Sequence, residues 1–128
     1  MKLRVKNNSV RLRLTRSEVA LFNDSGRVEE VIEFGIEPHQ RFIYAIESGA
    51  ETETMRAAIE NNRITILVPK QQADDWTNTA RIGIEAEQEI GDGKTLRLLI
   101  EKDFACLEPR TGEDDADTFS HPNEGKVL

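Results

Sequence analysis

Apolar and charged residues alternate at the start of the chain. Lys2–Lys6 and Ser9–Leu14 both follow a period of two, the pattern of β-strands that bury one face. Asn7-Asn8 lies between them, and asparagine tolerates the left-handed backbone that a two-residue hairpin turn requires. We therefore expect a hairpin with one apolar face. The basic side chains share its other face: Lys2, Arg4, Lys6, Arg11 and Arg13.

A helix is predicted directly after this hairpin. Thr15 and Glu18 stand at the two positions of a capping box, in which each residue satisfies a backbone N–H near the other. Gly26 follows as a residue that can end the helix. The alternation then resumes and predicts two further strands, over 27–34 and 41–47.

The same order of elements recurs with a shift of about 54 residues. Asn61-Asn62 repeats the predicted turn at Asn7-Asn8, Trp76 falls on Phe22, and Ile82 falls on Val28. We interpret the chain as two strand-strand-helix-strand-strand halves, 1–48 and 55–102, that arose by duplication. Chance similarity between two antiparallel meanders is the alternative.

Two such halves predict an α+β fold that is mostly antiparallel. Each half would bury its apolar face against the other, either in a barrel or in two packed sheets. Residues 1–107 are expected to form this single domain. Residues 108–128 lack periodicity and carry six acidic and two basic side chains, which predicts an acidic tail that is flexible or lies over the domain.

The formal net charge of −7 argues against non-specific binding to nucleic acids, which needs a basic surface. Cys106 is the sole cysteine and excludes an intramolecular disulfide. No apolar run is long enough to cross a membrane, and the first residues lack the apolar segment of a signal peptide. These features predict a cytoplasmic protein with no membrane association.

Two stretches, Asn8–Thr15 and Leu96–Leu107, resemble the sequences of a small bacterial family of uncharacterised proteins, a domain of unknown function. The resemblance extends over nearly the whole chain. It implies a bacterial cytoplasmic protein, and it implies no activity and no site residues.

The basic hairpin face is the main candidate site. The expected pairing sets Lys2 opposite Arg13 and Arg4 opposite Arg11, and each like-charge pair costs a few tenths to ~1 kcal/mol. Two interpretations offset this cost. In the first, the face binds a phosphate-rich or carboxylate ligand, or an anionic protein partner. In the second, carboxylates of neighbouring strands neutralise it: Glu33, Glu47, Glu85, Glu87, Glu89 and Glu101.

A metal-assisted, phosphate-processing enzyme with a tunnel-like β architecture is the alternative function. The basic side chains would then hold phosphate, and Glu85, Glu87 and Glu101 would hold a divalent metal ion. Such an enzyme needs its acids and bases to converge in one enclosed cavity, whereas a binding module spreads them over an open face. We favour the non-enzymatic module, which requires no cofactor.

The remaining candidates carry less chemistry. The C-terminal region holds potential metal ligands, but their spacing matches no metal motif; they are Cys106, Glu113, Asp114, Asp115, Asp117 and His121. We expect the acidic tail to solvate the protein or to fold back on the basic face, and the thiol of Cys106 to be buried and inert. Unpaired strand edges would also allow homo-oligomers to form.

Overall fold

The structure is a computed structural model that describes residues 1–51 and 53–104. Within these residues, eight strands and two α-helices follow one another in the order β-β-α-β-β, β-β-α-β-β, with a short 3-10 helix, η1, before β4. The first half contains β1 (Lys2–Lys6), β2 (Ser9–Leu14), α1 (Arg16–Ser25), β3 (Arg27–Glu33), η1 (Pro38–Gln40) and β4 (Arg41–Ala50). The second half contains β5 (Arg56–Glu60), β6 (Arg63–Pro69), α2 (Lys70–Asn78), β7 (Gly83–Gly91) and β8 (Lys94–Lys102).

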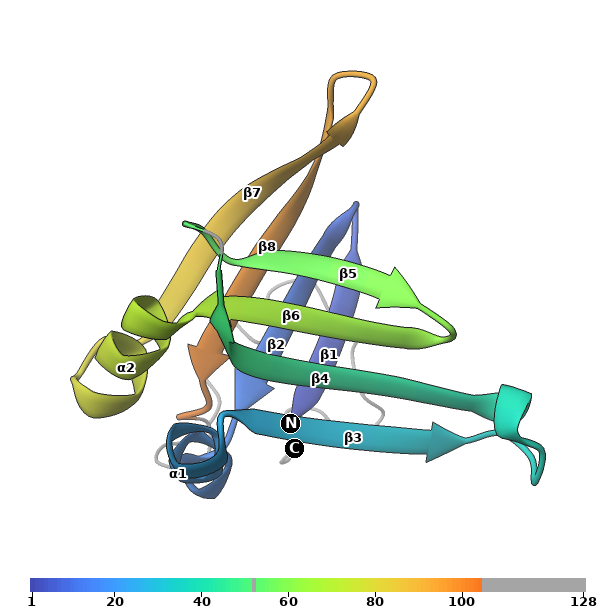
Figure 1. Ribbon diagram of the computed structural model, residues 1–128, viewed down its shortest axis with the longest axis horizontal. Coiled ribbons are helices and arrows are strands. Elements are labelled where there is room, and N and C mark those ends of the chain that lie inside the picture. Colours follow the sequence, from blue (N-terminus) through green and yellow to red (C-terminus); the bar gives the residue numbers. More distant parts are fainter. Residues whose placement is uncertain (52, 105–128) are drawn as a thin grey trace, which may run out of the picture.

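The strands form two four-stranded mixed sheets, each built from one hairpin of each half. Sheet 1 has the order β1-β2-β8-β7 and sheet 2 the order β3-β4-β6-β5. The central pairs, β2 with β8 and β4 with β6, are parallel, and the outer pairs are antiparallel. The strands of one sheet cross those of the other at a steep angle (Figure 1). The expected α+β class is confirmed; of its two architectures, the packed sheets are correct and the closed barrel is wrong.

The strand registers follow the predicted shift of 54 in most places. Val10 pairs with Leu98 in sheet 1, and the corresponding Ile64 pairs with Tyr44 in sheet 2. The shift fails at β7.

In β7, Ile84 pairs with Ile100. The equivalent pair in the first half is Val28 with Ile46, so Ile84 takes the place predicted for Ile82. The cause is a later start of the strand: β3 begins at Arg27, so the shift of 54 would start β7 at Arg81, but β7 begins two residues later, at Gly83. The predicted correspondence of Ile82 with the buried Val28 is therefore wrong, and the Ile82 side chain is 57% exposed.

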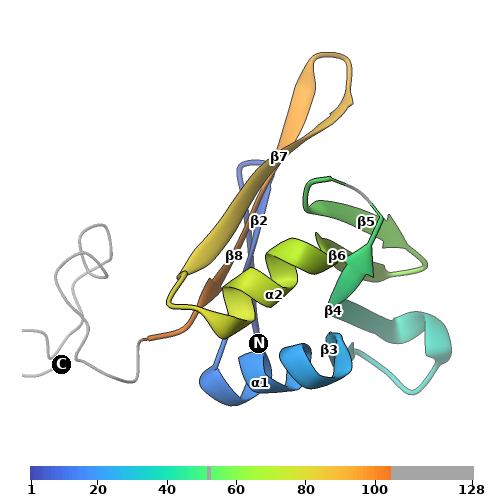
Figure 2. The same ribbon diagram turned by 60° about the vertical axis from the view of Figure 1, so that its left-hand side comes forward.

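Both helices lie at the same end of the two sheets and pack against each other (Figure 2). Phe22 of α1 and Trp76 of α2 meet edge to face, with ring centroids 6.0 Å apart. Both rings are buried, and the indole N–H of Trp76 donates to the carbonyl of Ile82 at 2.9 Å. Neither described helix is long and apolar enough to cross a membrane.

The local signals of the sequence act as expected. Thr15 and Glu18 form the capping box of α1, and Gly26 ends that helix in the left-handed conformation with φ of 78°. Both residues of the Asn7-Asn8 and Asn61-Asn62 turns have positive φ, which sets the two-residue hairpins and their registers.

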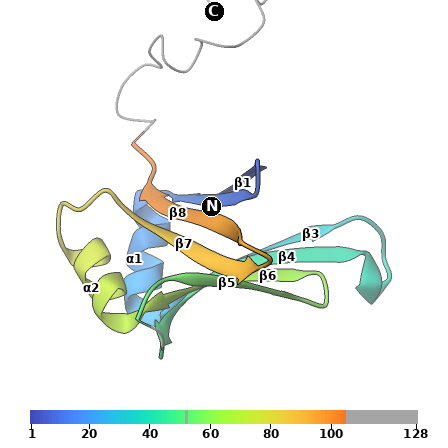
Figure 3. The same cartoon turned by 90° about the horizontal axis from the view of Figure 1, so that it is seen from above.

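Figure 3 shows the two sheets from above as two layers. Side-chain and backbone hydrogen bonds and ion pairs connect the layers at two of their edges. On one side, the Gln88 side chain of β7 accepts from the N–H of Ala57 at 2.7 Å and donates to its carbonyl at 3.1 Å. Gln88 thus occupies the hydrogen-bonding groups of β5 at that point, as a neighbouring strand would. On the other side, the ammonium group of Met1 pairs with Glu18 and Glu30, and the Tyr44 hydroxyl donates to the Met1 carbonyl.

Candidate anion-binding face

The predicted basic side chains lie together on the outer face of sheet 1. The apolar side chains of β2 point into the core, so Arg11 and Arg13 point outward. The pairing of Lys2 with Arg13 and of Arg4 with Arg11 is confirmed. We call Lys2, Arg4, Lys6, Arg11 and Arg13 the basic face.

A groove of about 270 Å³ runs between β1 and β2 on this face. Four of the five predicted cations line it, and Lys6 does not. The groove is lined by Lys2, Leu3, Arg4, Arg11 and Arg13.

Two guanidinium groups converge on a single carboxylate oxygen beside the groove. Arg11 Nε lies 2.7 Å and Arg13 Nη2 lies 3.0 Å from Oε1 of Glu101 on β8. Each guanidinium group has five N–H donors, and only some of them bind Glu101. The arrangement could hold a second oxyanion between the same two side chains.

Positive charge exceeds negative charge on the basic face. Lys2 Nζ lies 3.7 Å from Asp103, and Glu101 serves both arginines, so two carboxylates face five cations. Within residues 1–51 and 53–104, Arg4 and Lys6 have no ion-pair partner. Neutralisation by neighbouring strands is thus partial among the described residues.

The corresponding hairpin of the other half lacks this charge. The shift of 54 places Ala58, Thr65 and Leu67 where the basic face has Arg4, Arg11 and Arg13. The two hairpins have the same register, so the fold forms this element without the three arginines.

The outer face of sheet 2 carries matched charges instead. Arg27 contacts both Glu29 and Glu47, and Arg63 donates to Glu29 at 2.9 Å. Hydrogen bonds hold the pKa of Glu29 below its usual value; the bond from Arg27 contributes most and the bond from Arg63 comes second. Of the carboxylates expected to neutralise the basic face, Glu47 is thus paired on the other sheet, and Glu101 is the one that pairs with Arg11 and Arg13.

A second hollow, of about 590 Å³, lies next to the groove on the outer face of sheet 1. Arg11 and Arg97 contribute its cations, and Glu85 and Glu87 contribute its carboxylates from β7. The charge of this face therefore changes from basic at the β1 edge to acidic at the β7 edge. Sequence reasoning missed Arg97, because only the parallel pairing of β8 with β2 brings it beside Ser9.

The three predicted metal ligands do not form a cluster. Glu85 and Glu87 lie on β7, while Glu101 on β8 is engaged by Arg11 and Arg13. No three carboxylate, histidine or cysteine side chains of the described residues are placed to hold a metal ion. The acids and bases also lie on an open face rather than in an enclosed cavity, so the enzymatic alternative stays a prediction without geometric support.

The model of one protein family, described as a family of unknown function (DUF7009), matches residues 1–123. The chain belongs to this family. The resemblance to an uncharacterised family inferred from the sequence is thereby confirmed. Neither the curated proteins nor the solved structures gave a match to the chain.

Another hollow, of about 640 Å³, lies where α1 and α2 meet the end of β8. Leu14 and Val19 give it an apolar floor, and Arg16 and Lys102 lie at its rim. Phe104, the last described residue, lines it as well.

The potential ligands of the C-terminal region lie outside the described residues: Cys106, Glu113, Asp114, Asp115, Asp117 and His121.

The amino terminus forms a second charged cluster, on the inner side of the β1 edge. Burial opposes the charge of the Met1 ammonium group, but hydrogen bonds to Glu18 and Glu30 outweigh it and raise the pKa of that group. Burial likewise opposes the charge of Glu18, but its bonds to the amino terminus and to the Thr15 N–H lower its pKa. The pKa of the Tyr44 hydroxyl is raised by burial and by the charges of Glu30 and Glu18.

These shifts predict how stability depends on pH. The amino group has a raised pKa in the folded state, so its contribution is complete below about pH 8 and is lost as pH rises further. Glu18 has a lowered pKa, so its contribution is complete above about pH 4.3 and is lost as pH falls. Glu18→Gln keeps a side chain able to form the capping box but removes the charge. We expect it to flatten the loss of stability above about pH 8, measured by urea unfolding between about pH 5 and pH 10, where the amino group titrates and Glu18 stays charged.

Glu33→Gln is the matched control, because Glu33 is exposed and does not contact the amino terminus. Its unfolding free energy should follow the wild-type pH profile. Equal slopes for Glu18→Gln and wild type above pH 8 would contradict the assigned role of the amino terminus.

Proposed function

We propose that this protein is a non-enzymatic binding module whose basic face holds an anionic ligand or partner. Arg4, Arg11 and Arg13 supply planar guanidinium groups, which bind phosphate and carboxylate oxygens with two donors each. The ligand would lie along the groove of about 270 Å³ and share Arg11 and Arg13 with Glu101.

The comparison between the two halves carries this proposal. Ala58, Thr65 and Leu67 show that the hairpin does not need arginine at these three positions for its structure. Facing like charges also destabilise a strand pair, by about 0.2–1 kcal/mol for each pair. A face that keeps such charges in one half and lacks them in the other is better explained by binding than by folding.

The test transfers the residues of the second half onto the first, in the variant Arg4→Ala/Arg11→Thr/Arg13→Leu. Tripolyphosphate should raise the thermal unfolding midpoint of the wild-type protein, since a ligand that binds only the folded state stabilises it. We expect the variant to bind at least about tenfold more weakly, because each charge-assisted hydrogen bond contributes about 1.5–3 kcal/mol. Titration calorimetry gives the dissociation constants.

The matched control removes three arginines from elsewhere, in the variant Arg41→Ala/Arg56→Ala/Arg81→Ala. It changes the net charge by the same amount and replaces no residue of the four strands of sheet 1. Its affinity for tripolyphosphate should stay within about twofold of the wild-type value, since screening weakens distant charges. No binding by the wild-type protein, or equal losses in the two variants, would overturn the proposal.

Three further features belong to the same proposal. We infer that the two halves arose by duplication, since element order and most registers repeat with a shift of 54 residues. The acidic segment 108–128 would act as a competing anion for the basic face when no other ligand is bound. A cytoplasmic location is proposed from the absence of any cysteine pair in the sequence.

A further inference from the structure

We propose that the anionic partner of the basic face is the acidic edge strand of a second copy of this chain, so that β1 of one copy pairs with β7 of the next. The inference rests on the proposed function and names its partner. It requires that the two strands be free edges, run in compatible directions and carry matching side chains.

β1 and β7 are the two edges of sheet 1. An edge strand presents a row of backbone donors and acceptors that another strand can take up. β1 is antiparallel to β2, β2 is parallel to β8, and β8 is antiparallel to β7. The two edges therefore run in the same direction, and a second copy placed beside the first continues sheet 1 with a parallel pair.

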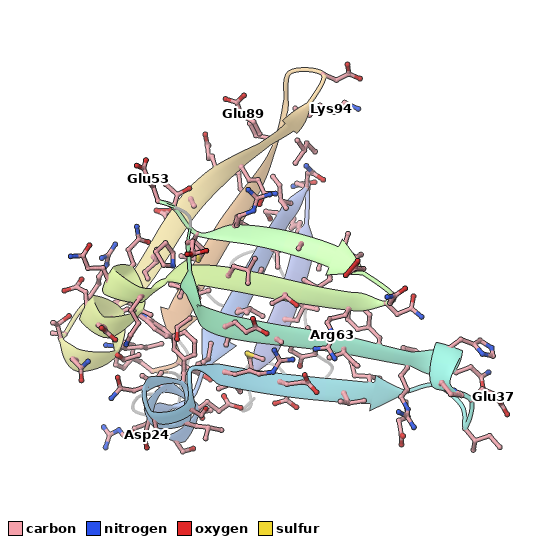
Figure 4. All side chains as sticks on the ribbon, viewed as in Figure 1. Asp24, Glu37, Glu53, Arg63, Glu89 and Lys94 are labelled. Atoms are coloured by element: carbon pink, nitrogen blue, oxygen red, sulfur yellow. The ribbon has the colours of Figure 1, made fainter. Side chains whose placement is uncertain are left out.

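The outward charges of the two strands match along that pair. β1 carries its cations at every second position, and β7 carries its carboxylates at every second position, on the same face of sheet 1. Figure 4 shows Glu89 projecting outward from β7 near the tip of its hairpin. One register sets all three pairs side by side: Lys2 with Glu85, Arg4 with Glu87, and Lys6 with Glu89.

These charges remain available in the described part of the chain. Only Lys2 of the six residues has an ion pair there, with Asp103. Glu85, Glu87 and Glu89 are exposed, as are Arg4 and Lys6. Pairing would give each cation of β1 a carboxylate.

The same charges exclude the competing strand pairs. Two β1 strands would set cations against cations, and two β7 strands would set carboxylates against carboxylates, which is destabilising in both cases. In sheet 2, Gln88 already occupies the edge of β5 at Ala57, and Arg27 of β3 is paired with Glu29. The pair of β1 with β7 is thus the one that the charges favour.

The opposite face of the two strands gains apolar contact in this arrangement. Val5 of β1 is 63% exposed on the side of the sheet that holds the core, and Ile90, in the irregular part of β7 between Glu89 and Gly91, is 50% exposed. In the register given above, Val5 lies beside Gln88 and diagonally from Ile90. Covering these aliphatic side chains adds a hydrophobic term to the ion pairs.

The geometry also fixes the kind of assembly. The two contacting surfaces differ, so the contact is head to tail and does not close into a two-fold dimer. Each added copy leaves one basic and one acidic edge free. The mean mass should therefore rise continuously with protein concentration instead of reaching a plateau at a dimer.

Sedimentation velocity of the full chain in low salt tests the inference, with two charge-reversed variants. The first is Lys2→Glu/Arg4→Glu/Lys6→Glu, and the second is Glu85→Lys/Glu87→Lys/Glu89→Lys. We expect wild-type protein to associate and to dissociate on addition of salt. Each variant alone should remain monomeric, with a dissociation constant raised by about tenfold or more. An equimolar mixture should associate again, because each variant then offers the charge that the other lacks.

Re-association in the mixture also shows that both variants are folded, and their thermal unfolding midpoints give an independent check. Wild-type protein that stays monomeric at its highest soluble concentration would overturn the inference, as would a mixture that stays monomeric while both variants are folded. Binding of tripolyphosphate separates this failure from failure of the proposed function. If the protein is monomeric but binds tripolyphosphate through the basic face, the proposed function stands and only the inference of assembly with a second copy fails.

Discussion

Replacing Trp76 with alanine is expected to lower the free energy of unfolding by about 3–5 kcal/mol, the usual cost of removing a fully buried aromatic side chain. Its side chain is fully buried between the helices and the sheets. The substitution also removes the edge-to-face contact with Phe22 and leaves the Ile82 carbonyl without its N–H donor. Urea unfolding followed by circular dichroism measures the loss.

Leu21→Ala on α1 is the matched control, because Leu21 is also apolar and helical but is 50% exposed. We expect it to cost less than about 1 kcal/mol. Trp76→Phe should fall between the two variants, since it keeps an aromatic ring and loses only the hydrogen bond and part of the packing. Similar losses for Trp76→Ala and Leu21→Ala would show that Trp76 is not central to the core.

Gly83→Ala is expected to destabilise the protein by about 1–3 kcal/mol through overpacking. A Cβ at Gly83 would lie 2.7 Å from the carbonyl oxygen of Ile100 on the neighbouring strand. That oxygen belongs to the backbone of β8, so β7 or β8 must shift to make room. The backbone angles of Gly83 lie outside the left-handed region, so the effect reports the clash alone.

Gly35→Ala provides the control for this effect. There the added Cβ meets the end of the Gln40 side chain, which can rotate away, and not the backbone of another strand. We expect a loss well below that of Gly83→Ala, measured by the same unfolding experiment. Equal losses would mean that β7 and β8 adjust to the new methyl group without cost.

Local features of the fold could be predicted from the sequence because each depends on neighbouring residues. The Asn7-Asn8 turn sets the β1–β2 register, and Thr15 with Glu18 sets the start of α1. The matching positions of Phe22 and Trp76 in the two halves correctly placed both rings in the core.

Features that depend on distant parts of the chain could not be predicted in the same way. Nothing in the sequence indicates that β2 pairs in parallel with β8, yet this pairing brings Glu101 to Arg11 and Arg13. The gapless alignment also hid the later start of β7, because Ile82 and Ile84 have the same parity and are equally apolar. Burial of Ile84 is decided by contacts with β8.

The candidate site also combines local features, which the sequence predicted, with features that depend on distant strands, which it did not. The cations of the basic face lie on one hairpin, so their common face followed from the alternation of residues. The change from basic to acidic across sheet 1 involves all four strands and both halves. Arg97 and the position of the acidic edge therefore became visible only with the sheet order.

The contacts that tie the two sheets together differ in their chemistry on the two sides of the molecule. Along β5 and β7 the tie is a neutral amide, formed by Gln88 with the Ala57 backbone. Beside β1 and β3 it is mainly ionic, formed by the Met1 ammonium group with Glu18 of α1 and Glu30 of β3, together with the hydrogen bond from Tyr44 to the Met1 carbonyl. Ionic strength and deprotonation weaken the second tie and leave the first unchanged. Salt and high pH should therefore weaken the contacts between the sheets only beside the strand that carries the basic face, while the shared core and the Gln88 contact continue to hold the two layers together.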